Sequence, residues 1–126
     1  MKVLVIEDDP GIVEVVSLCF QLRWSGASLI SAERGAKGLE CVESENPDVV
    51  ILDIGLPDMD GYQVLREIRR FSDVPVIMLT NLTWLPGPEV PLAHGALDVW
   101  VKSEIKPKEL VDRVNKFFGG KNSAAQ

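Results

Sequence analysis

The sequence has few of the residues that build disulfide frameworks or zinc sites, with two cysteines and one histidine among 126 residues. Cys19 and Cys41 both lie in apolar helical patterns, so we expect reduced thiols in a protein core rather than a disulfide. His94 has no cysteine or histidine neighbour at metal-ligand spacing, which argues against a zinc site at this position.

Long apolar runs are missing as well. The sequence holds no stretch of about 18 apolar residues that could span a membrane. The apolar run at residues 3–6 is too short for a signal peptide and is followed at once by three acids. We therefore expect a cytoplasmic protein without membrane contact. A net charge of -6 and the lack of a basic cluster argue against nucleic-acid binding by this domain itself.

The composition that is present is typical of one soluble globular domain. Hydrophobic residues make up 46% of the chain and charged residues 25%, both ordinary values. A chain of this length fits a single domain with one real core. We expect a domain over residues 1–120 and a disordered tail over residues 121–126, because Gly119 and Gly120 are typical of a helix end.

Short apolar strands alternate with amphipathic helices along the chain. We expect strands at 3–6, 28–32, 49–52, 74–79 and 97–101. We expect helices at 10–23, 36–45, 61–71 and 107–118. The helix over 61–71 is expected to turn Phe71 toward the core. This alternation predicts an α/β fold with a five-stranded parallel sheet and helices on both faces.

Polar residues follow four of these strands at the point where each strand ends. They are Glu7, Asp8 and Asp9, then Asp53, Thr80 and Lys102. The carboxyl ends of parallel strands meet at one edge of a sheet, so these side chains can converge. Carboxylates that lie close together need a cation, and oxygen ligands favour Mg²⁺. A lysine and a hydroxyl beside such a site suit phosphoryl transfer to Asp53.

At these residues the chain resembles the receiver domain of two-component response regulators, of which chemotaxis response regulators are one kind. The resemblance covers about residues 2–118. Its motifs are VIEDD at residues 5–9, DVVILDIGLPDMDG at 48–61, VPVIMLT at 74–80, and Gly95-Ala96 followed by Lys102. The resemblance implies a flavodoxin-like three-layer sandwich with strand order 2-1-3-4-5.

The resemblance also implies a role for each site residue. Asp53 matches the phosphoacceptor of the family. Asp8 and the backbone carbonyl of Gly55 match direct Mg²⁺ ligands, as Asp53 also does, and Glu7 matches an acid that acts through water. The remaining matched positions are Thr80 as the switch hydroxyl and Lys102 as the phosphate-binding lysine. Asp9 either caps the helix that follows it or competes with Asp8 for the metal.

The implied phosphoryl donor is a phosphohistidine on a sensor histidine kinase or a phosphotransfer protein. The resemblance also implies an output partner of unknown identity. The family catalyses its own phosphorylation and slow dephosphorylation, so we do not expect an enzyme in the ordinary sense.

Three departures from the family pattern stand out. Ser103 follows Lys102 where the family usually has proline, so a cis bond is not expected there. Val99 occupies the position of a common aromatic switch. The segment 84–91 is rich in proline, and Pro91 would fall inside the family's fourth helix. Interior proline costs about 3 kcal/mol or more, so we expect a short or irregular fourth helix after an irregular loop.

Two further interpretations are open. The departures are compatible with a receiver-like interaction module that is not phosphorylated, although the intact acids, hydroxyl and lysine argue against it. An aspartyl-phosphate phosphohydrolase of the haloacid-dehalogenase type needs an acid two residues after the nucleophile, and this chain has Gly55 there.

Trp84 and Leu85 either contact a partner or form a lid on the domain's own core.

Overall fold

The computed structural model describes residues 1–81, 95–104 and 106–123, the last five of these by backbone alone. The strands are β1 (Lys2–Ile6), β2 (Ser28–Ala32), β3 (Val49–Asp53), β4 (Val76–Thr80) and β5 (Asp98–Val101). The helices are α1 (Pro10–Arg23), α2 (Gly35–Glu45), α3 (Gly61–Arg69) and α5 (Pro107–Ser123), with a 3₁₀ turn η1 (Lys102–Glu104). From β1 to β4, strands and helices therefore alternate as the sequence predicts.

The five strands form one parallel sheet in the order β2-β1-β3-β4-β5. The chain builds outward from β1 to β2 and then crosses to β3 on the other side of β1. The connection after β1 leads to one side of the sheet and the connection after β3 leads to the other side. Open parallel sheets place their ligand sites at such a point, here at the carboxyl ends of β1 and β3. The expected fold class and strand order are confirmed.

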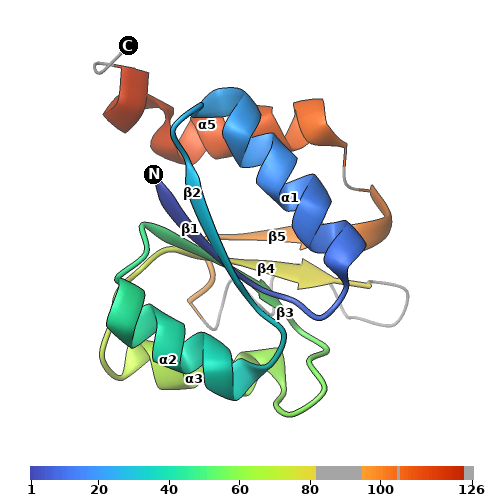
Figure 1. Ribbon diagram of the computed structural model, residues 1–126, viewed down its shortest axis with the longest axis vertical. Helices are drawn as coiled ribbons and strands as arrows, with labels where there is room; N and C mark the ends of the chain where they lie inside the picture. The colour runs from blue at the N-terminus through green and yellow to red at the C-terminus, as the bar shows by residue number, and fades with distance from the viewer. Residues whose placement is uncertain (82–94, 105, 124–126) are drawn as a thin grey trace.

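The sheet is the middle of three layers. Helices α1 and α5 cover one face, and α2 and α3 cover the other (Figure 1). Strands β3 and β4 are buried along their whole length, and β1 along all but its first residue. These strands are buried on both faces, which explains why they read as continuous apolar runs. Each face of the sheet has its own hydrophobic core.

Two acids fix where helices begin beside the sheet edge. The carboxylate of Asp9 accepts a hydrogen bond from Gly11 N at 2.9 Å, and Pro10 opens α1. Asp60 caps α3 in the same way by accepting from Tyr62 N at 2.8 Å. An aspartate at the N-cap followed by a proline at the first helical position is a strong helix start.

Two expectations about helix ends are wrong. Helix α3 ends at Arg69, so Phe71 lies in the turn beyond it and is 49% exposed instead of facing the core. Helix α5 continues through Gly119 and Gly120 to Ser123. Neither glycine adopts the left-handed conformation that ends a helix, and helical glycine costs only about 1 kcal/mol relative to alanine. The division into a domain and a tail at residue 120 stays a prediction.

The remaining local expectations concern the two cysteines, the peptide bond after Lys102 and the fourth helix. Both cysteines are free and buried. Among the described residues, no peptide bond is cis, including the bond between Lys102 and Ser103. The expected short fourth helix, with Trp84 and Leu85, falls on residues 82–94, outside the described residues.

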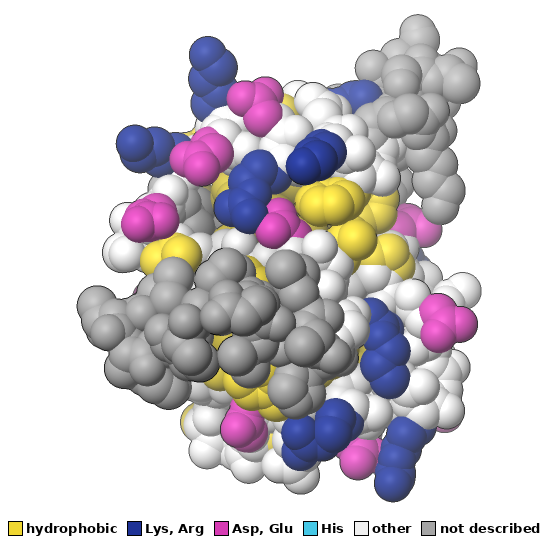
Figure 2. All heavy atoms as spheres, turned by 180° about the vertical axis from the view of Figure 1, so that it is seen from behind, with side chains coloured by type: hydrophobic (Ala, Val, Ile, Leu, Met, Phe, Trp, Pro, Cys, Tyr) yellow, Lys and Arg dark blue, Asp and Glu magenta, His cyan; other side chains and the backbone are white. Residues whose placement is uncertain are grey.

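The described part of the surface is mixed in charge. On the face that Figure 2 shows, acidic and basic side chains lie next to one another instead of forming separate patches. Within the ranges that the structure describes, no helix combines the length and the apolar character needed to cross a bilayer.

Candidate functional site

The carboxyl ends of four strands surround a hollow of about 340 Å³. Its lining consists of Asp8, Asp9, Asp53, Ile54, Gly55, Thr80, Asn81 and Lys102. All the residues that the sequence predicts for the site are in this lining except Glu7, which is buried. The sheet topology has therefore gathered residues that lie at or just beyond the carboxyl ends of β1, β3, β4 and β5.

Three acids come close enough to share a cation. Glu7, Asp8 and Asp53 each offer one carboxylate oxygen, and these oxygens all lie within 4.8 Å of one another. Glu7 is 1% exposed and Asp53 is 3% exposed, whereas Asp8 is exposed to solvent. Carboxylates packed this closely repel each other unless a cation or a proton compensates them.

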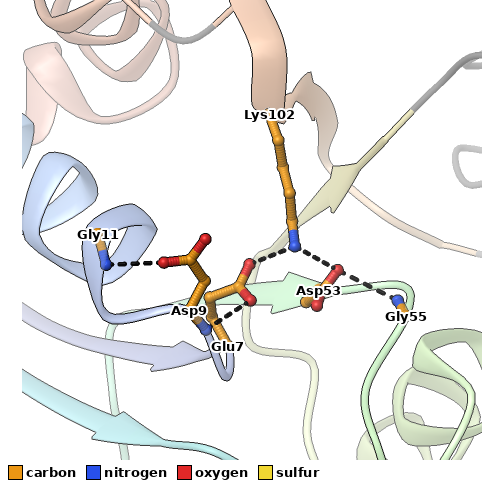
Figure 3. Close-up of polar contacts among 6 residues, drawn as sticks. All are labelled: Glu7, Asp9, Gly11, Asp53, Gly55 and Lys102. Carbon is orange, nitrogen blue, oxygen red and sulfur yellow. Dashed lines mark hydrogen bonds and ion pairs between the residues drawn. The ribbon is translucent and has the colours of Figure 1, made fainter.

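Lys102 supplies part of that compensation (Figure 3). Its ammonium nitrogen lies 2.7 Å from Glu7 Oε1 and 3.1 Å from Asp53 Oδ1. Lys102 follows the last residue of β5, in η1, and reaches back across the edge of the sheet. One ammonium group therefore bridges Glu7, the buried acid that follows β1, and Asp53, the acid that ends β3.

Burial and pairing both shift the ionisation of these groups. Burial raises the pKa of Glu7 to about 7, and the hydrogen bond from Lys102 only partly opposes this effect. Burial alone would lower the pKa of Lys102, but its bonds to Glu7 and Asp53 outweigh burial and raise that pKa above its ordinary value. Lys102 therefore stays charged at neutral pH, and Glu7 takes up a proton more readily than an ordinary glutamate does.

Asp53 is held at the edge of the sheet by its backbone neighbours. Gly55 N donates to Asp53 Oδ1 at 3.1 Å, and Ile54 N donates to Leu79 O at 3.0 Å. Thr80, the last residue of β4, is 2% exposed and belongs to the lining of the same hollow. A carboxylate, a hydroxyl and an ammonium group thus border one small space.

Asp9 has a different environment from Asp8. Its carboxylate turns toward α1, where it accepts from Gly11 N, and its own backbone N–H donates to Glu7 Oε2 at 3.1 Å (Figure 3). Asp9 is not one of the three acids whose oxygens converge. Of the two alternatives for Asp9, the structure favours the helix cap.

Sequence reasoning did not single out Asn81 or Ile54, which also line the hollow. Each directly follows a predicted site residue at the end of a strand, and this adjacency was the only available signal. Asn81 lines the hollow next to Thr80, the last residue of β4.

Comparison with known proteins identifies the relatives of this chain. A family model for the response regulator receiver domain matches residues 3–115. The probable transcriptional regulator ycf27 of Guillardia theta is 40% identical over 124 residues, which are 98% of this chain and 48% of that protein. The DNA-binding response regulator MtrA of Mycolicibacterium smegmatis is 39% identical over 113 residues, which are 90% of this chain and 48% of that protein. The chain thus spans about half the length of these curated relatives.

Solved structures agree with this assignment. One is the receiver domain of the sensor histidine kinase PA1611 from Pseudomonas aeruginosa PAO1, a crystal structure with a magnesium ion coordinated in its active-site cleft. It matches with a TM-score of 0.79 and 27% sequence identity, over 94% of this chain and 97% of that one.

Proposed function

The chain belongs to the family of response regulator receiver domains, the phosphoacceptor modules of two-component signalling, and we propose that its Asp53 accepts the phosphoryl group. The observation that carries this proposal is the position of Asp53. It ends a fully buried central strand, opens onto the hollow and shares an ammonium group with a second acid. No other acid in the lining combines these three properties.

The donor set of the site suits Mg²⁺. It consists of oxygen atoms alone, the three carboxylate oxygens lie within 4.8 Å of one another, and hard oxygen ligands are those that Mg²⁺ prefers. We propose that Asp8, Asp53 and the backbone carbonyl of Gly55 hold the ion, with Glu7 acting through a water molecule. When bound, the ion neutralises charge on the phosphoryl oxygens.

Asp53 and Lys102 have different roles in the phosphoryl transfer. A carboxylate oxygen of Asp53 attacks the phosphorus atom of a phosphohistidine, the P–N bond breaks, and the imidazole nitrogen keeps the electron pair. The product is an aspartyl phosphate. Lys102 pairs with a phosphoryl oxygen, for which its position 3.1 Å from Asp53 Oδ1 is suited.

Thr80 is the residue we assign to the switch. Its hydroxyl donates to a phosphoryl oxygen on Asp53, and this new contact favours one of two pre-existing arrangements of the surface around β4. The donor protein is a sensor histidine kinase or a phosphotransfer protein, and the output partner is a further protein or domain. We place this reaction in the cytoplasm, and we assign the domain no catalytic turnover beyond its own phosphorylation and dephosphorylation.

Intact-mass spectrometry after treatment with acetyl phosphate and Mg²⁺ tests the proposal. We expect the mass of one phosphoryl group to be added, Asp53→Asn to abolish the addition, and chelation of Mg²⁺ to suppress it. Asp48→Asn is the matched control, because Asp48 stands at the opposite end of β3 and accepts a hydrogen bond from Lys2 N at 2.7 Å. Stable labelling of the Asp53 variant at the normal level would contradict the assignment.

The same experiment addresses the second candidate, a receiver-like interaction module that is not phosphorylated. Ser103 stands where the family pattern has proline, and the segment 84–91 is rich in proline where the family has its fourth helix. These two departures favour that candidate. A chain that folds normally but takes up no phosphoryl group at saturating acetyl phosphate and Mg²⁺ would support it.

A further inference from the structure

Helix α2 is capped by a residue from another part of the chain. Its own N-cap residue, Arg34, makes no side-chain hydrogen bond to the helix. Instead, the carboxylate of Asp58 accepts from Gly35 N at 2.7 Å and from Ala36 N at 3.1 Å. Asp58 lies in the β3–α3 loop, residues 54–60, which passes beside the start of α2 (Figure 1).

This loop carries Gly55 and follows Asp53 directly. It is closed at its base by an antiparallel bridge between Gly55 and Asp60, and by a hydrogen bond from Gly61 N to Ile54 O at 2.8 Å. These contacts join the loop to β3 and α3. The two hydrogen bonds of Asp58 attach the loop to a further helix, α2. This attachment lies in the part of the loop away from Gly55.

Helix α2 is a rigid point of attachment for the loop, because it packs closely against β1 and α3. A Cβ atom placed on Gly38 would lie 2.5 Å from Ile6 Cδ1, and one on Gly35 would lie 2.8 Å from Val64 Cγ2. The helix axis therefore cannot move toward β1 or α3 without a clash. A loop tied to the first turn of α2 takes its position from the sheet and from α3.

The carboxylate is also suited electrostatically to this contact. The first turn of a helix leaves N–H groups without intrahelical partners and carries partial positive charge. Hydrogen bonds from Ala36 N and Gly35 N hold the pKa of Asp58 below its ordinary value. These hydrogen bonds therefore favour the ionised form of the Asp58 carboxylate.

We propose that Asp58 is a positioning residue for the phosphorylation site, because it ties the loop that presents the Gly55 carbonyl to the N-terminus of α2. This inference rests on the proposed function, in which that carbonyl is a ligand of Mg²⁺. Residues that orient metal ligands typically change metal affinity when they are replaced, although they never touch the ion.

A Mg²⁺ titration followed by the amide NMR resonance of Gly55 tests the proposal in the absence of phosphorylation. We expect Asp58→Ala to weaken Mg²⁺ binding about tenfold. It should also remove the slow hydrogen exchange of Gly35 N–H and Ala36 N–H. Asp58→Asn keeps one acceptor oxygen, so it should restore much of the affinity. If the alanine variant folds poorly, Asp58→Asn is compared with Asp48→Asn. A lower Mg²⁺ affinity in Asp58→Asn than in Asp48→Asn is then the expected result, and equal affinities would overturn the positioning role.

The matched control is Asp48→Ala. Asp48 also accepts a backbone hydrogen bond across elements, from Lys2 N at 2.7 Å, but at the other edge of the sheet. Both alanine variants should lose similar thermal stability, whereas Mg²⁺ affinity should fall only in Asp58→Ala. Equal affinity in the two variants would overturn the positioning role.

The two proposals fail in different ways. If the unaltered chain shows no Mg²⁺-dependent shift that Asp8→Ala removes, the proposed metal site is wrong, and the inference is wrong with it. If the unaltered chain binds Mg²⁺ normally and Asp58→Ala binds it equally well, the inference alone is wrong.

Discussion

Lys102 sets the charge balance of the site at the scale of single residues. Its ammonium group pairs with Glu7 at 2.7 Å and with Asp53 at 3.1 Å, and its side chain is only 13% exposed. Removing one partner of such a buried set leaves the other charges uncompensated, which costs about 3–5 kcal/mol where water is excluded. The cost here should be smaller, because the hollow admits solvent.

We predict that Lys102→Met lowers the free energy of unfolding by about 2 kcal/mol in Mg²⁺-free buffer, and that Mg²⁺ restores part of the loss by neutralising the same acids. Chemical denaturation with and without Mg²⁺ measures this. Lys2→Met is the control, because its pair with Glu45 at 3.5 Å is on the surface and should contribute less than about 1 kcal/mol. Equal losses in the two variants, or no effect of Mg²⁺ on the Lys102 variant, would contradict the charge balance described.

The raised pKa of Glu7 predicts how stability depends on pH. Burial raises this pKa from 4.5 to about 7, so between these values the folded chain holds a proton that the unfolded chain releases. Without Mg²⁺, the free energy of unfolding should therefore fall as pH rises from 4.5 to 7, on the order of 2–3 kcal/mol.

Glu7→Gln should flatten this part of the profile, and denaturation at a series of pH values measures the difference between the two chains. Identical slopes would mean that Glu7 ionises in the folded chain as it does in the unfolded one. Added Mg²⁺ should also flatten the profile of the unaltered chain, since a cation favours the ionised acid.

The sequence could identify the residue types of the site but not all of their roles. Acids, a hydroxyl and a lysine at strand ends were readable because parallel strands share one carboxyl edge. The three consecutive acids Glu7, Asp8 and Asp9 were not separable by pattern. Their roles depend on backbone angles at the start of α1, where Asp9 is extended with φ -91° and ψ 111° and turns its carboxylate to the helix.

At the scale of elements, Gly61 fixes how α3 leaves the sheet. A Cβ atom at this position would lie 2.6 Å from both Asp53 O and Ile54 Cα, which are backbone atoms that cannot rotate away. The start of α3 therefore rests directly on the residue that we assign as phosphoacceptor. Any side chain at position 61 must push the β3–α3 loop outward.

We predict that Gly61→Ala destabilises the domain by about 1–3 kcal/mol, as overpacking does, and reduces phosphorylation by acetyl phosphate more than the loss of folded protein explains. Gly26→Ala is the control, since a Cβ there meets no atom within 4 Å. It should change stability by less than about 0.5 kcal/mol. Thermal unfolding and intact-mass spectrometry measure the two effects, and a Gly61 variant as stable and as reactive as the Gly26 variant would contradict the close packing.

Strands and helices were predictable to different degrees. The central strands are buried on both faces, so their apolar runs are unambiguous in the sequence. Helix ends were harder to predict, because they depend on contacts beyond the local pattern. Helix α3 stops at Arg69, where Arg69 Nη1 donates to Val74 O at 2.7 Å and fixes the following turn. Helix α5 passes through two glycines that the pattern assigns to its end.

At the scale of the whole molecule, the site depends on the arrangement of the entire sheet. Its side chains lie at or just beyond the carboxyl ends of β1, β3, β4 and β5. These segments are far apart in sequence and come together only through the strand order 2-1-3-4-5. Alternating strands and helices predict a parallel sheet, but they do not fix this order. The order followed from the resemblance to receiver domains, and the structure confirms it.

We propose that these distant oxygen atoms form one binding site for Mg²⁺ around Asp53. A crystal structure of the chain grown with Mg²⁺ is the decisive experiment. We expect one ion in contact with a carboxylate oxygen of Asp8, a carboxylate oxygen of Asp53 and the carbonyl oxygen of Gly55. Asp8 and Asp53 oxygens too far apart to bind the same ion, or an ion bound elsewhere while this hollow holds only water, would show that the proposed magnesium site is wrong.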